Sequence, residues 1–324
     1  MGRGKFRIGG MKYETLSLAK INLEDERFRT SFHPDLDRLI LSIKKVGLLS
    51  PPLVCRGDKG FILVSGWKRV LACRDLGLPA IGALVTGEKN GLRLFLLGLY
   101  ENLATREIGL AEKAEVLSKL LKFGVEKKTL LRSYLPLLSL PATAAHLEVL
   151  LDLSKADNGV KEFVGEKELP LPLVQSLLQF MPVEQKLVLP LLRPLGQNKQ
   201  KEIVEDFWEI SRRDDVSVQK VLGETEMRQA LGSPKLSPLE KAEKIRSILR
   251  RKRYPQLSSW QEAFASTLRK VRWPKSIAIQ PSPYFEGEDI SVSFRFKNEE
   301  EFKAGLKKLQ EVSGKQEFSR LFKR

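Results

Sequence analysis

The residues best suited to chemistry lie where a predicted strand meets a predicted helix. The segment from Val64 to Ala72 reads V-S-G-W-K-R-V-L-A, which places Gly66 at the helix start and Lys68 and Arg69 in the first helical turn. Free backbone N–H groups and the helix dipole favour an anion there, and glycine lets the anion approach the backbone. The pattern suits a phosphate site, but taken alone it favours a solvated helix start.

A second polar group stands between two helical stretches, where Glu101 and Asn102 are adjacent and Arg106 follows. Magnesium prefers oxygen ligands and usually takes one or two from the protein, completing its shell with phosphates and water. Glu101 and Asn102 are thus of the right type to hold a magnesium ion that carries a triphosphate, although such a pair at a helix end more often has a structural role. A helix cap or a solvated surface pair is the alternative.

The composition fits a folded chain of two or three domains, because 42% of its 324 residues are apolar. No run of eighteen apolar residues is free of charge, so no membrane span is expected. The basic amino terminus has no apolar core behind it, unlike a secretory signal, and the cytoplasm is the expected compartment. Cys73 falls in the apolar pattern of a helix, which predicts a buried structural thiol.

The net charge of +16 indicates a polyanionic partner. Twelve lysines and arginines against three glutamates lie between Ala230 and Lys275. Clustered cations bind duplex DNA mainly by releasing counterions, without base contacts. We therefore expect non-specific DNA binding here, with a solvated amphipathic helix as the alternative; the proposed DNA contacts are Lys244, Arg250, Arg251, Lys252 and Arg253.

The remaining pattern predicts the elements that position these residues. Residues 1–14 are a basic leader, and 15–106 read as a small mixed α/β domain. Residues 107–230 are helical, with an apolar stripe beginning at Ile108, and 231–240 contain linker-like serines and prolines. Residues 241–324 combine the basic helix with an α+β end domain, in which a hairpin with one buried face precedes a helix capped by Asn298.

In order and separation, three segments resemble motifs of the amino-terminal domains of the ParB partition-protein family, which share a ParB/sulfiredoxin-like fold. Residues 42–53, S-I-K-K-V-G-L-L-S-P-P-L, resemble the "SI-K-x-x-G-L-x-x-P" segment. Residues 66–72, G-W-K-R-V-L-A, resemble the "GERRxRA" box, and 101–103, E-N-L, resemble the start of the "ENLxR" motif. The resemblance covers residues 16–122 well and the helices beyond only loosely.

The resemblance implies a CTP pocket with Mg²⁺ held by Glu101 and Asn102. In the family the first segment contributes to the cytosine side and the second binds phosphates. The expected nucleotide contacts are therefore Ser42, Gly47, Leu48, Pro51, Gly66, Trp67, Lys68, Arg69 and Arg106.

This chain departs from the family pattern at three positions. Trp67 stands where the family has Glu, Lys68 replaces an Arg, and Thr105 replaces the Arg of the third motif. Binding is expected to survive these changes better than hydrolysis, because a carboxylate is lost; at most we expect a slow CTPase.

The family also carries a helix-turn-helix, which would place its two helices near 127–135 and 142–153. Between Ser133 and Ser154 the sequence has no Lys, Arg, Asn or Gln, which a reader of base edges needs. Thr143 and His146 are the possible contacts, although a packed or surface histidine is the alternative for His146. We interpret the element as degenerate.

The fold class we expect is multidomain α/β plus all-α: a ParB-type α/β domain, a helical middle domain and a small α+β end domain. By resemblance, the end domain would pair two copies, and Arg3, Lys5 and Arg7 would touch a ParA-type ATPase unless the leader is disordered. The predicted function is a CTP-switched clamp or scaffold, associated with the nucleoid, in DNA partition or nucleoid organisation. The alternatives are a ParB-fold nuclease or phosphotransferase, and a DNA-coating adaptor that has lost nucleotide.

Overall fold

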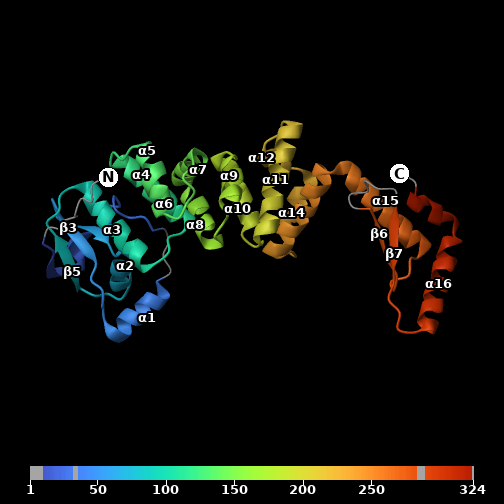
Figure 1. The fold of residues 1–324 in the computed structure, drawn as a ribbon, viewed down its shortest axis with the longest axis horizontal. Coiled ribbons are helices and arrows are strands. Elements are labelled where there is room, and N and C mark those ends of the chain that lie inside the picture. Colours follow the sequence, from blue (N-terminus) through green and yellow to red (C-terminus); the bar gives the residue numbers. More distant parts are fainter. Residues whose placement is uncertain (1–9, 32–35, 283–288, 323–324) are drawn as a thin grey trace. The chain divides into compact units, whose positions relative to one another are not determined.

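The computed structural model describes residues 10–31, 36–282 and 289–322. The chain divides into two compact units, Met1–Arg193 and Pro194–Arg324. Figure 1 labels the helices and strands of each unit where there is room. The predicted helical domain at 107–230 is therefore shared between the two units. The predicted linker at 231–240 lies within the second unit, because the helix after it packs on the helices before it. None of the described helices is long and apolar enough to cross a lipid bilayer.

The first unit begins with a five-stranded sheet in the order β1-β5-β3-β4-β2. Its antiparallel pairs are β1 with β5 and β3 with β4, whereas β3 with β5 and β2 with β4 are parallel. Between and after the strands lie a short 3-10 turn and three helices. The bounds are β1 Lys12–Ser17, η1 Leu18–Lys20, β2 Ile21–Asn22, α1 Asp37–Val46, β3 Leu53–Gly57, β4 Gly60–Ser65, α2 Trp67–Asp75, β5 Ala80–Thr86 and α3 Gly91–Thr105.

Alternation along the strands builds the core of this domain. In β5 the side chains of Ile81, Ala83 and Val85 are buried, and they join Val54 and Leu63 in one apolar cluster. Burying each large aliphatic side chain contributes about 1.5–3 kcal/mol. The predicted small α/β domain is confirmed, and its first two strands, β1 and β2, are separated only by the 3-10 turn η1.

The helices that follow pack through the predicted apolar stripe. Along α4, Leu110–Lys122, the side chains of Ala111, Ala114, Leu117 and Leu120 are buried. This helix contacts α7 and α8. The further elements of the first unit are α5 Lys127–Thr129, the π-helical turn η2 Leu130–Tyr134, α6 Leu135–Leu137, α7 Ala144–Lys155, α8 Asn158–Lys167, α9 Leu171–Leu178 and α10 Pro182–Leu192.

The second unit packs four helices together and ends in a hairpin and a helix. Helix α14 contacts both α11 and α13. The elements are α11 Gln197–Asp214, α12 Val218–Leu222, α13 Thr225–Gly232, α14 Pro238–Arg253, α15 Pro255–Val271, β6 Ala278–Pro281, β7 Ile290–Ser293, α16 Glu299–Ser313 and the 3-10 turn η4 Gln316–Phe322.

The carboxy-terminal hairpin pairs β6 and β7 in antiparallel fashion, and Asn298 caps α16 by accepting from the Glu301 backbone N–H at 2.8 Å. The buried hairpin face expected from the sequence is not present in the described part of this segment. Val292 is 43% exposed and Phe296 is 52% exposed, because two strands and one helix do not supply a second layer over this face.

Candidate nucleotide site

A cavity of about 310 Å³ lies within the first unit where the two predicted polar segments meet. Both segments contribute to its wall. The residues from Val64 to Arg69 come from the end of β4 and the start of α2. The end of α3 and the residue after it contribute Glu101, Asn102, Thr105 and Arg106. The other lining residues are Phe28, Thr30, Ser31, Leu39 and Ser50.

Arg69 joins three separate segments of the chain at this cavity. Its Nη2 donates to Oε1 of Glu101 at 2.6 Å, and its Nη1 donates to Oγ of Ser50 at 2.8 Å and to the carbonyl of Pro51 at 3.1 Å. The guanidinium carries donors in a planar fork, so a single side chain can hold several acceptors at fixed angles. The segments at 42–53, 66–72 and 101–106 therefore converge on one residue.

Gly66 permits this junction to form. It caps α2 with φ +96°, and a Cβ at this position would lie 2.8 Å from Cβ of Pro52. Both the left-handed backbone and the contact with Pro52 require glycine. Among the described residues no side chain caps the first turn of α2, so its backbone N–H groups are available to a ligand.

The two other cations of the site differ in their partners. Arg106 lines the cavity, but its guanidinium forms a two-point ion pair with Glu112 at 2.7 and 2.9 Å. Lys68 is half-buried and forms no ion pair within the described residues. Lys68 is thus the cation of this wall whose charge is not balanced by a described carboxylate.

Trp67 belongs to both the core and the cavity. Its side chain is 7% exposed and packs in the apolar cluster of the sheet domain. The Arg29 guanidinium lies 5.2 Å from the centre of the indole ring, a cation–π arrangement. The tryptophan that departs from the family pattern is therefore integrated into the fold.

Glu101 and Asn102 fit the ligand chemistry of magnesium. Arg69 occupies Oε1 of Glu101, while Asn102 donates through Nδ2 to the carbonyl of Gly98 at 2.8 Å, which fixes the orientation of its amide. One carboxylate oxygen and one amide oxygen remain, which matches the small number of protein ligands that a nucleotide-bound magnesium takes. Elsewhere among the described residues, no cluster of three or more His, Cys, Asp or Glu side chains suits a metal ion.

One wall of the cavity was not predicted from the sequence. This wall comes from the segment between β2 and α1 and consists of Phe28, Thr30 and Ser31. The apolar residues of that segment follow neither helical nor strand spacing. Of the residues expected on the cytosine side, Pro51 contributes its carbonyl to Arg69. Neither Pro51 nor the other three residues of this set is among the described residues that line the cavity; the three are Ser42, Gly47 and Leu48.

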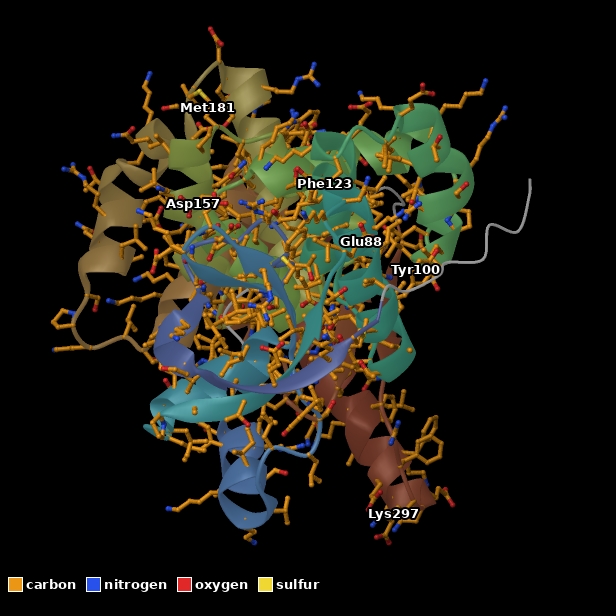
Figure 2. The ribbon with its side chains drawn as sticks, turned by 90° about the vertical axis from the view of Figure 1, so that its left-hand side faces the viewer. Glu88, Tyr100, Phe123, Asp157, Met181 and Lys297 are labelled. Carbon is orange, nitrogen blue, oxygen red and sulfur yellow. The ribbon has the colours of Figure 1, made fainter. Side chains whose placement is uncertain are left out.

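The same segment is tied to helix α4 on its other side. Lys119, which is 7% exposed, donates from Nζ to the carbonyl of Glu26. Phe28 stacks on Phe123, labelled in Figure 2, with ring centroids 6.0 Å apart. Burial lowers the pKa of Lys119 to about 8. One short segment thus contacts both the cavity and the helical layer.

The basic helix α14 holds most of its proposed DNA contacts in ion pairs. Arg253 pairs with Asp206 at 2.8 Å, Lys252 with Glu224 at 2.9 Å, and Arg251 with Glu226. Paired cations contribute less attraction for phosphate, since a carboxylate already offsets their charge. Lys244 and Arg250 form no ion pair within the described part of the chain and remain the stronger DNA candidates on this helix.

The two helices expected for DNA recognition form close to the predicted ranges, at 127–137 and 144–155. Thr143 caps α7 by accepting from the His146 backbone N–H at 3.2 Å, and its Oγ1 lies 2.6 Å from Nδ1 of His146. Both side chains therefore have a local structural role at the start of α7. The predicted buried thiol is also present, since Cys73 is fully buried and burial raises its pKa.

No family model matches the chain. The curated relatives include the chromosome-partitioning protein Spo0J of Thermus thermophilus, which is 30% identical over 186 residues that span 50% of this chain and 68% of Spo0J. The chain belongs to the ParB family. A probable chromosome-partitioning protein ParB of Chlamydia muridarum is 28% identical over 187 residues, and the match spans 65% of that ParB protein, slightly less than two thirds of its length.

Solved ParB structures resemble the chain weakly in overall geometry. The C-terminally truncated ParB from Caulobacter crescentus, complexed with CTP-gamma-S, gives a TM-score of 0.27 at 19% identity, covering 53% of this chain and 94% of that structure. A Pnob8-like ParB-N domain gives 0.38 at 13% identity, covering 69% and 97%. The ParB membership of this chain therefore stands on its sequence relatives.

Proposed function

We propose that this ParB-family chain binds CTP with Mg²⁺ in the cavity around Arg69 and acts as a nucleotide-switched clamp or scaffold on DNA. The convergence of the three ParB-like segments on Arg69 carries the proposal. Each segment alone allows a structural interpretation, but their meeting at one cavity with an uncapped helix start supports a nucleotide site. In this site Glu101 and Asn102 would hold the metal ion, which screens the triphosphate charge when bound.

The binding test is isothermal titration of the full chain with CTP, ATP and GTP in magnesium. We expect selective CTP binding that is abolished in Arg69→Ala. Arg56→Ala is the matched control, since Arg56 is an exposed arginine of the same sheet that pairs with Glu14 outside the cavity. No binding of any of the three nucleotides would contradict the proposal and favour the DNA-coating adaptor.

The DNA contact is proposed for the cations of the second unit that lack ion pairs within the described residues. Because binding by counterion release weakens as salt rises, log affinity for a random duplex should fall linearly with log salt. Joint replacement of Lys244 and Arg250 by Ala should flatten that slope by about two units, one for each phosphate that the variant no longer neutralises. An unchanged slope would place the DNA surface elsewhere; the other candidates are Arg269, Lys270, Arg272 and Lys275.

Self-association is proposed through the exposed apolar face of the hairpin and α16. Phe296 and Phe302 lie with ring centroids 4.9 Å apart and are 52% and 38% exposed, and Leu306 of the same helix is 42% exposed. A second copy would cover this face. Nucleotide would then drive closure of two joined chains by binding the closed state more tightly, which predicts faster crosslinking between copies with CTP than without.

The remaining expectations depend on the same proposal. Association with the nucleoid in the cytoplasm follows from DNA binding. A ParA-type ATPase is the proposed further partner, and the basic residues suggested for that contact, Arg3, Lys5 and Arg7, lie outside the described residues. A nuclease or phosphotransferase is less well supported, because Glu101 is the one carboxylate among the described residues lining the cavity and no histidine accompanies it there.

A further inference from the structure

Two buried polar atoms beside Gly66 have no hydrogen-bond partner among the described residues. Ser65 is 2% exposed and Trp67 is 7% exposed, and the atoms concerned are Oγ of Ser65 and Nε1 of Trp67. Both residues line the cavity that contains Arg69 and Glu101. The two orphaned groups therefore flank the start of α2 at the cavity wall.

Such atoms are costly, which makes their position informative. A buried polar group left without a partner costs about 1–3 kcal/mol, and most buried polar groups in folded proteins are satisfied. A phenylalanine at position 67 would supply the apolar contacts of Trp67 and the ring beneath Arg29 without an N–H to satisfy. The indole N–H adds nothing to the packing, so a bound group is the natural source of its partner.

The surrounding groups specify the chemistry of that bound group. An indole N–H can only donate, a serine hydroxyl can donate, and the first-turn N–H groups of α2 are donors too. Lys68 adds a positive charge that no carboxylate balances within the described residues. Arg69 and Arg106 also line the cavity, where Glu101 is the one carboxylate among the described lining residues. The donors and the unbalanced charge of Lys68 match an acceptor-rich anion, and phosphate oxygens are such acceptors.

We propose that Ser65 Oγ and Trp67 Nε1 donate directly to phosphate oxygens of the bound nucleotide. This rests on the proposed function, and it assigns a role to the tryptophan that replaces the usual carboxylate of the motif. A donor at position 67 stabilises the phosphate charge directly, where a carboxylate would repel it. Ser65 and Trp67 then recognise the phosphates that all nucleoside triphosphates share, and base selectivity belongs to other residues of the cavity.

The test compares CTP affinity of the full-length chain with that of Trp67→Phe and Ser65→Ala. Removing a hydrogen bond to a charged group should weaken CTP binding about tenfold or more in each variant. The preference for CTP over GTP should stay unchanged, since both nucleotides present the same phosphates. Trp208→Phe is the matched control, because Trp208 lies in the second unit and outside the cavity.

A direct readout keeps the proposal falsifiable even if Trp67→Phe folds poorly. The chain has four tryptophans, and the indole N–H signal of Trp67, assigned by exclusion from Trp→Phe variants of the other three, should move downfield when CTP binds the native protein. Normal CTP affinity in both variants with an unmoved indole signal, while Arg69→Ala abolishes binding, would overturn this inference and leave the proposed function standing. Failure of the native chain to bind nucleotide would overturn both.

Discussion

Nη2 of Arg69 donates to Oε1 of Glu101 across 2.6 Å, although 32 residues separate them in the sequence. The contact fixes the carboxylate at the cavity wall and leaves the second carboxylate oxygen for another partner. It also means that Arg69 is part of the fold before any ligand arrives. A bound phosphate would therefore share Arg69 with Glu101, and a bound metal ion would share Glu101 with Arg69.

The Arg69–Glu101 pair should therefore show a measurable coupling energy in the free protein. Their side chains are 18% and 36% exposed, so a double-mutant cycle by urea denaturation, with Arg69→Ala and Glu101→Ala, should give about 1 kcal/mol. The Arg56–Glu14 pair, at 67% and 31% exposure, should give only a few tenths, about the usual value for exposed pairs. A coupling no larger than in this control pair would contradict the structural role of the contact.

Gly66→Ala should destabilise the first unit and weaken nucleotide binding together. The positive φ costs about 1 kcal/mol for alanine, and the contact with Pro52 adds to it, so the free energy of unfolding should fall by about 2–3 kcal/mol. Gly77→Ala is the control, since Gly77 has φ +68° but open space around its Cβ position. Equal destabilisation of the two variants would show that the Pro52 contact is unimportant.

Lys119 should make stability rise with pH in the alkaline range. Burial lowers its pKa from 10.5 to about 8, so between these values the unfolded chain binds more protons than the folded one, and unfolding becomes less favourable as pH increases. Relative to Lys119→Met, the native chain should gain about 1–3 kcal/mol between pH 7.5 and pH 10.5. Urea denaturation at both pH values measures this gain, with Lys122→Met as an exposed control; a constant difference between native and Lys119→Met chains would contradict it.

Arg253→Met should affect stability more than DNA binding. Asp206 is 4% exposed, and removing its partner leaves a buried carboxylate unpaired, at a cost of about 3 kcal/mol. Burial already raises the pKa of Asp206 while Arg253 opposes the rise. Without Arg253 that pKa should rise further, so the stability deficit should shrink as pH falls and the carboxyl is protonated.

The control for this prediction is Arg250→Met on the same helix. Arg250 is exposed and unpaired within the described residues, so its replacement should change stability by less than about 0.5 kcal/mol and should weaken DNA binding instead. Thermal denaturation and duplex binding of the two variants distinguish the roles. The assignment of Arg253 to stability and Arg250 to DNA binding fails if the two variants lose stability and DNA affinity in the same proportion.

Phe296→Ser should reduce self-association without unfolding the chain. The ring is 52% exposed and contacts Phe294 and Phe302, so the substitution removes apolar surface from a face that solvent already reaches. Sedimentation equilibrium should show a weaker dimer, with a Tm close to that of the native chain. Tyr13→Ser, which removes a 67% exposed ring from the first unit, is the control that should leave association unaltered.

The sequence predicted those parts of the site that have local signatures. Arg69 and Gly66 stood out because a strand end, a glycine and two cations occur within a few residues. Thr30 and Ser31 did not, because an irregular segment reveals its neighbours only when the chain is folded. The carboxylate partner of Arg69, Glu101, was predicted to be a metal ligand, but its contact with Arg69 could not be foreseen across 32 positions.

The charge of α14 shows the limit of counting residues along the chain. A window of sequence around Arg253 contains many cations and few acids, yet Asp206, 47 residues earlier, is the buried carboxylate that Arg253 contacts. The net charge counted over a stretch of sequence does not include carboxylates that lie outside the stretch but contact it in the fold. The strands and helices were easier to predict, because the regular spacing of apolar residues that identifies them lies entirely within each element's own sequence.

The segment from Glu24 to Ser31 gives the cavity and helix α4 a shared boundary. Thr30 and Ser31 line the cavity, and the carbonyl of Glu26 accepts from the buried Lys119 of α4. Linkage is reciprocal: if a ligand prefers one position of this segment, then whatever holds α4 in the matching position must raise the affinity for that ligand by the same factor. A partner that never touches the nucleotide could thus set how tightly the nucleotide is held.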